Sequence, residues 1–143
     1  MRRELEERAR RCRSLVGIVV AALAYPVVAA AGGDVAFTTQ LQPLFDARCV
    51  VCHQYGAAQA GLSLEDGDAH ANLVGVKSTE SKLLRVAAGA PEESYLLYKL
   101  RGTHASGGGT GARMPLPDTG AAPLSAAELK MIETWIEQGA PNN

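Results

Sequence analysis

The clearest hydrophobic pattern lies near the end of the chain, in PLSAAELKMIETWIEQGAP. Ser125 and Glu128 stand at the two positions of a capping box at a helix start, and Gly139 favours a helix end. The large apolar residues between them recur at the three- and four-residue spacing of one helix face: Leu129, Ile132, Trp135 and Ile136. The pattern therefore predicts a helix that buries this face.

Two earlier stretches also predict helices. The first begins at Thr39 or Gln40 and runs into CVVCH, because Pro43 is tolerated in a first turn and Leu41, Leu44 and Phe45 share one face. The second is PEESYLLYKLRG, with Pro91 suited to a first helical position and Gly102 to a stop. A short helix is expected at residues 69–74.

Residues 102–123, GTHASGGGTGARMPLPDTGAAP, have a composition that builds neither helix nor sheet. A loop of this length inside a small domain is usually functional or disordered. The patterns together predict a mainly α domain with a long Gly/Pro-rich loop.

The first residues have a different organisation. A basic segment is followed by an apolar run from about Leu15 to Val28 and by the small residues Ala29 to Ala31. This order is typical of a secretory signal, so we expect residues 1–31 to be a signal peptide and residues 32–143 the domain, exported to the periplasm. An uncleaved anchor in the inner membrane, facing the periplasm, is the alternative. The run falls short of the roughly 20 apolar residues that a spanning helix needs.

The net charge of the chain limits the classes of partner that it is expected to bind. The whole sequence has a formal charge of −1, and residues 32–143 contain eight Lys and Arg against twelve Asp and Glu, which gives −4. Nucleic-acid binding depends on neutralising phosphates with basic side chains. We therefore expect no nucleic-acid partner, and membrane contact only if the N-terminal segment is retained.

The motif CVVCH brings Cys49, Cys52 and His53 together, and three uses compete for it. A redox dithiol needs a thiolate favoured by a helix start, whereas here a predicted helix ends at the pair. A zinc site needs a closed shell of four ligands, completed by His70 or His104. The third use is covalent haem, for which C-x-x-C-H is the attachment signature. On a helical turn both sulfurs reach one edge of a porphyrin, and His53 reaches the iron. Covalent haem agrees best with export and with the absence of other thiols after residue 31.

Together these pieces resemble monohaem class I type cytochromes c. They are most similar to small bacterial domains in which an RMP-containing loop precedes a capped, Trp-bearing helix. The likeness covers about residues 36–141 through QPLFDARCVVCH, PEESYLLYKL, RMP and LSAAELKMIETWIEQGAP. It implies a small helical domain wrapped around one covalently bound haem c with its iron. It also implies an electron-transfer protein rather than an enzyme, which passes single electrons between a donor and an acceptor redox protein.

The second axial ligand of the iron decides whether the site is closed. Two internal methionines are candidates, and Met131 on the last helix is more typical of core packing. By the resemblance, His53 is the proximal ligand and Met114, in RMP, the distal one. His104 is the alternative distal ligand, with His70 behind it. Arg113 is either a partner of a haem propionate or a solvated charge.

Two other functions remain open. The domain could be a haem-bearing subunit of a larger oxidoreductase or haem assembly. It could instead be an open-iron sensor or peroxidase-like protein. The side chains expected against or near the ring are Phe45, Tyr95, Leu96, Tyr98 and Trp135.

Overall fold

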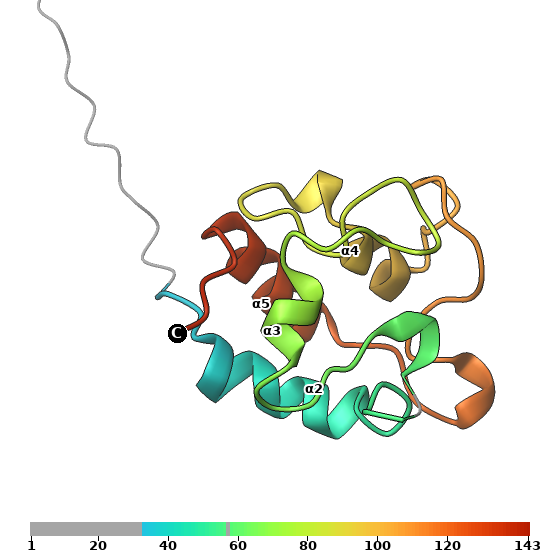
Figure 1. Cartoon of the computed structure of the whole chain (residues 1–143), viewed down its shortest axis with the longest axis horizontal. Helices are drawn as coiled ribbons and strands as arrows, with labels where there is room; N and C mark the ends of the chain where they lie inside the picture. The colour runs from blue at the N-terminus through green and yellow to red at the C-terminus, as the bar shows by residue number, and fades with distance from the viewer. Residues whose placement is uncertain (1–32, 57) are drawn as a thin grey trace, which may run out of the picture. The chain divides into compact units, whose positions relative to one another are not determined.

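A computed structural model describes residues 33–56 and 58–143, and the predicted signal segment lies outside them. The elements are short helices and helical turns (Figure 1). They are the π-helical turn η1 (Phe37–Leu41), α2 (Gln42–Arg48), α3 (Ala69–Leu73), α4 (Tyr95–Arg101) and α5 (Ala126–Glu137), with the 3₁₀ turns η2 (Gln59–Gly61), η3 (Pro91–Glu93) and η4 (Pro117–Thr119). The described residues form isolated β-bridges but no strand, which confirms the expectation of a mainly α domain. None of the helices in this part of the chain is long and apolar enough to cross a bilayer.

Helix α5 forms as its sequence predicts. The Ser125 hydroxyl accepts the backbone N–H of Glu128 at 3.2 Å, and the Glu128 carboxylate accepts the backbone N–H of Ser125 at 2.6 Å. This capping box satisfies two of the amide groups that a helix start leaves without partners. The backbone N–H of Ser125, which donates to the Glu128 carboxylate, lowers the pKa of Glu128.

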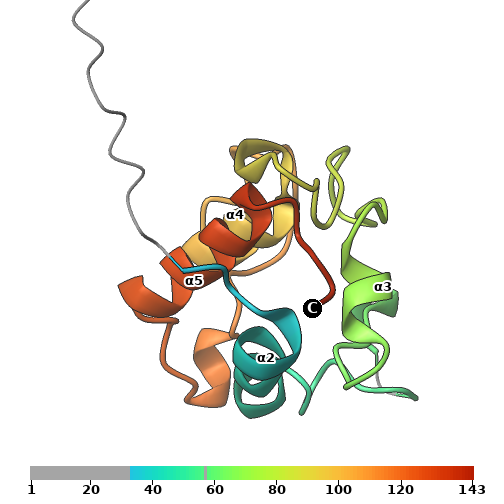
Figure 2. The same ribbon diagram turned by 90° about the vertical axis from the view of Figure 1, so that its left-hand side faces the viewer.

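The core lies where the apolar faces of α2, α4 and α5 meet, and Figure 2 shows α4 beside α5 with α2 below them. Trp135 is fully buried there and donates its indole N–H to the carbonyl of Pro141 at 2.9 Å. The rings of Phe37 and Trp135 lie 5.3 Å apart between centroids. The core therefore joins the first helix to the last.

The first helix begins earlier than predicted, at Phe37 rather than at Thr39 or Gln40. The reason lies at the other end of the chain. The side-chain oxygen of Asn143 accepts the backbone N–H of Phe37 at 2.9 Å, and its backbone carbonyl accepts that of Thr38 at 2.9 Å. These contacts satisfy amide groups that the local sequence leaves open.

The predicted helix PEESYLLYKLRG is interrupted at Ser94, whose backbone is extended, so the single helix was wrong. The buried Ser94 hydroxyl accepts the N–H of Ala87 and donates to the carbonyl of Ala90, both at 2.9 Å. Helix α4 begins only after this residue. The N–H groups of its first residues bond to the carbonyls of Leu84 and Arg85 instead of to a preceding turn.

Candidate functional site

A cavity of about 670 Å³ brings together the four predicted ligand and attachment residues. Cys49, Cys52 and His53 line it from the turn that follows α2, and Met114 lines it from the glycine-rich loop. Its volume falls in the range of about 300–1,000 Å³ usual for cofactor sites. Two segments 61 residues apart in the chain, at His53 and Met114, thus share one cavity.

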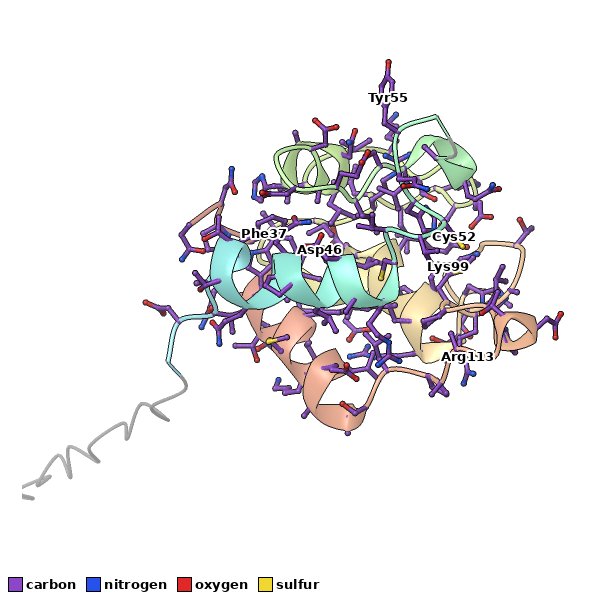
Figure 3. All side chains as sticks on the ribbon, turned by 90° about the horizontal axis from the view of Figure 1, so that it is seen from below. Phe37, Asp46, Cys52, Tyr55, Lys99 and Arg113 are labelled. Atoms are coloured by element: carbon purple, nitrogen blue, oxygen red, sulfur yellow. The ribbon has the colours of Figure 1, made fainter. Side chains whose placement is uncertain are left out.

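The CVVCH turn follows α2 directly without being part of it. The helix ends at Arg48, and the backbone N–H of Cys49 still bonds to the carbonyl of Phe45 at 2.8 Å. The N–H of His53 then bonds to the carbonyl of Cys49 at 3.0 Å, which closes one helical turn. Cys52 is exposed, and Figure 3 shows it on the same side of the domain as Lys99, which lines the cavity too.

The imidazole of His53 is hydrogen-bonded through Nδ1. Its Nδ1 lies 3.1 Å from the carbonyl oxygen of Leu62. Because a carbonyl can only accept, Nδ1 carries the proton and Nε2 keeps its lone pair. Burial lowers the pKa of His53, which favours the neutral ring that a metal requires. This is the arrangement typical of a metal-binding histidine with a second hydrogen-bond partner.

The environment of Cys49 argues against a redox dithiol. Burial raises the pKa of its thiol from the ordinary 9.0 to about 11. Reactive cysteines of dithiol sites have a lowered pKa, often at a helix start, whereas Cys49 follows the last residue of α2. The thiol is therefore a weak nucleophile.

Alkylation of Cys49 by iodoacetamide at pH 8 should be on the order of tenfold slower in the folded, haem-free chain than in the same chain in urea. A rise of the pKa from 9.0 to about 11 lowers the thiolate fraction about 100-fold, and the more basic thiolate regains about tenfold in intrinsic nucleophilicity. Peptide mass spectrometry over time measures the rate at this residue separately from Cys52. Equal rates in both conditions would contradict the buried position of Cys49.

A zinc site finds no support in the described residues, where no three His, Cys, Asp or Glu side chains come together as a metal shell. His70 is half-buried at the edge of the core, with Nε2 at 2.8 Å from the carbonyl of Ala140 and its ring edge-on to Phe37. His104 is half-buried in the glycine-rich loop and does not line the cavity. The two histidines that could have completed a zinc shell therefore lie elsewhere.

Met114 is fixed through its backbone. Its N–H donates to the carbonyl of Lys99, near the end of α4, at 3.0 Å, and its side chain packs partly buried against the core. Met131 packs against the same core from α5 and does not line the cavity. Of the two internal methionines, only Met114 is placed where a side chain can reach a group held by His53.

One wall of the cavity contains an ion pair between a buried lysine and a half-buried glutamate, which the sequence did not predict. The Nζ of Lys99 lies 2.7 Å from Oε2 of Glu80 and donates to the carbonyl of Thr110 at 3.3 Å. The Lys99 ammonium also lies 5.9 Å from the centre of the Tyr95 ring. Sequence alone assigns Lys99 to the negative end of a helix, because Glu80 is 19 positions away in a stretch without periodicity.

The glycines of the loop allow it to approach α4 closely. A Cβ at Gly109 would collide with the ring and hydroxyl of Tyr95, and a Cβ at Gly107 would come within 3.1 Å of the Tyr98 ring. The Tyr95 hydroxyl donates to the carbonyl of Thr110 at 3.3 Å. The composition that excludes regular structure thus lets residues 107–110 lie on two tyrosines.

The other side chains expected near the ring are divided between cavity and core. Tyr95 and Leu96 line the cavity, whereas Phe45 and Trp135 are buried in the core and Tyr98 lies under Gly107. Arg113 packs its aliphatic part against Gly102 and does not line the cavity. Its Nε has no hydrogen-bond partner among the described residues.

The residues of this cavity fit a covalently held haem. Two thiols and an imidazole lie on one wall, and a thioether stands on a separate segment. Leucines form much of the remaining surface, and the cations Arg48, Arg85 and Lys99 also line the cavity. Neither the protein-family models, nor the curated proteins, nor the solved structures compared with this chain give a match.

Proposed function

We propose that this protein is a one-electron carrier of the c-type cytochrome class, with one haem c attached covalently. The observation that carries the proposal is the shared cavity of Cys49, Cys52, His53 and Met114, in which His53 already has its Nδ1 proton engaged by Leu62. Bound haem would supply a reversible one-electron couple between ferric and ferrous iron.

Each of these residues has a defined role in the proposal. The thiols of Cys49 and Cys52 would hold the haem covalently, because addition of each S–H across a vinyl group forms one carbon–sulfur and one carbon–hydrogen bond with no net oxidation. Nε2 of His53 and the sulfur of Met114 would bind the iron. A thioether in the second axial position raises the reduction potential and leaves no open site for a substrate.

The acidic surface favours a basic redox partner. Residues 32–143 have a formal charge of −4, and complementary charge mainly increases the rate of encounter between partners. Electron exchange with such a partner should therefore slow as salt is added, because exposed charges are screened within about 8 Å at physiological ionic strength.

Mass spectrometry of the chain produced with a cytochrome c maturation system tests the proposal. We expect a mass equal to the polypeptide plus one haem, which stays attached after denaturation because the bonds are covalent. A redox titration of the same sample should follow a one-electron curve. The mass also shows whether residues 1–31 are removed.

The matched control is the double variant Cys49→Ala/Cys52→Ala, expressed in the same way. It should have the mass of the polypeptide alone after denaturation. A wild-type chain that never acquires haem under these conditions would refute the proposed function.

A further inference from the structure

Arg85 lines the same cavity as His53, and its guanidinium donates hydrogen bonds to backbone carbonyls. Nη1 donates to the carbonyl of Asn72 at 2.9 Å. Nη2 donates to the carbonyls of Ala60 and Gly61 at 2.9 and 3.2 Å. No carboxylate lies within ion-pair distance of this cation in residues 33–56 and 58–143. A planar fork of fixed donors suits this bridging, which a lysine cannot reproduce.

The turn that Arg85 holds has an unfavourable backbone. Ala60 has φ 55° and ψ 24°, in the left-handed region, and Gly61 follows with φ 62°. A non-glycine residue rarely adopts this conformation, because its Cβ crowds the following carbonyl. Such residues persist where surrounding contacts hold them, often at functional sites. Here the holding contacts include both bonds from Arg85.

This turn is directly connected to the histidine. Leu62 follows Gly61, its N–H closes the turn on the carbonyl of Gln59 at 3.1 Å, and its own carbonyl accepts the Nδ1–H of His53. A displacement of residues 60–61 therefore moves the carbonyl that sets the orientation and basicity of the imidazole.

We propose that Arg85 is a positioning residue, which holds the strained turn 59–62 so that the Leu62 carbonyl meets His53. This inference rests on the proposed function, because its consequence concerns the iron that His53 would bind. A hydrogen bond to the second nitrogen makes an imidazole a stronger donor. Stronger donation stabilises ferric over ferrous iron and lowers the reduction potential.

The variant Arg85→Lys tests this role in the haem-loaded protein, because it keeps the positive charge and removes the fork. We expect the preference for ferric iron to fall by about tenfold, which is the lower end of the effect that losing a ligand's hydrogen-bond partner has on metal affinity. This fall corresponds to a rise in potential of about 59 mV for one electron. The His53 Nδ1 proton, followed by NMR, should exchange faster with solvent.

Two further variants act on the same turn and on another cavity arginine. Gly61→Ala leaves Arg85 in place but puts a side chain at φ 62°, so it should raise the potential and speed the same proton exchange. Gly61→Ala also tests the role of this turn if Arg85→Lys does not fold. Arg48→Lys is the matched control, because Arg48 lines the cavity but bonds to Glu128 and to the carbonyls of Ala122 and Pro123. It should leave the His53 proton unchanged.

Relief of strain gives an independent test. In Ala60→Gly/Arg85→Lys the left-handed position no longer has a Cβ, so part of the shift should be recovered. The inference is overturned if haem is attached and neither Arg85→Lys nor Gly61→Ala changes the His53 proton exchange or the potential. It is also overturned if Arg48→Lys has the same effects. A wild-type chain without haem would instead refute the proposed function, and the mass spectrum distinguishes the two cases.

Discussion

Replacing Met114 with Ala is expected to abolish the weak long-wavelength absorption band of methionine–iron ligation in the ferric protein. Met114 is the methionine that the structure places at the cavity with His53, and its backbone is fixed by Lys99. In the proposed haem protein the iron would then lose its sixth ligand and become open to added ligands such as imidazole. The reduction potential should fall by on the order of 0.1 V or more, since axial ligands set haem potentials over about 0.8 V. Absorption spectra and a redox titration measure both effects.

Met131→Ala and His104→Ala are the controls for this experiment. Met131 packs against the core from α5, and neither residue lines the cavity, so the band should persist in both variants. Persistence of the band in Met114→Ala would show that Met114 is not the ligand. Absence of the band from the wild-type haem protein would favour the imidazole alternative, whereas its loss only in His104→Ala would indicate a change in the loop that carries both residues.

Trp135→Ala should cause the largest loss of stability. The side chain is fully buried, contacts the Phe37 ring and bonds to Pro141. Truncating a buried tryptophan costs about 3–5 kcal/mol, a large part of the roughly 5–15 kcal/mol by which domains are stable. The urea midpoint should fall by on the order of 2 M, given a slope of about 1–3 kcal/mol per M. Urea unfolding followed by circular dichroism measures this midpoint.

Trp135→Phe separates packing from hydrogen bonding. It keeps an aromatic ring against Phe37 but leaves the Pro141 carbonyl without its indole donor, a loss of about 0.5–1.5 kcal/mol. Some apolar volume is lost as well, so we expect a decrease in the free energy of unfolding that is clearly smaller than in Trp135→Ala. A decrease below about 1 kcal/mol in the Ala variant would not agree with a central core position.

The candidate site was predictable where its chemistry is local. Cys49, Cys52 and His53 are close in sequence, and one helical turn is enough to place them together, as the bond from His53 to Cys49 shows. Met114 was a candidate because it lies in the loop whose composition excludes regular structure. Its backbone bond to Lys99 was not predictable, since it joins the loop to a helix through main-chain groups that every residue has.

The partners of these residues could not be predicted for the same reason. The hydrogen bond to His53 comes from a backbone carbonyl, and Arg85 holds the turn before it through other carbonyls. The pair of Lys99 and Glu80 depends on the packing of α4 against an irregular segment. The residue types at these positions do not predict these contacts, because the contacts form only when the backbone is folded.

The helices show where local sequence is enough. The capping box and apolar face of α5 lie within one segment, and the structure has this helix as the sequence alone determined it. The break at Ser94 and the early start at Phe37 were decided by tertiary structure. At the break, the Ser94 hydroxyl accepts the N–H of Ala87, and the Leu84 carbonyl accepts the N–H of Tyr95. At the early start, the side chain of Asn143 accepts the N–H of Phe37. These hydrogen bonds outweigh the small differences in helix propensity among neighbouring residues. The sequence by itself thus determined helix α5 and the thiol and imidazole chemistry of CVVCH. Tertiary structure decided which backbone groups hold that chemistry in place.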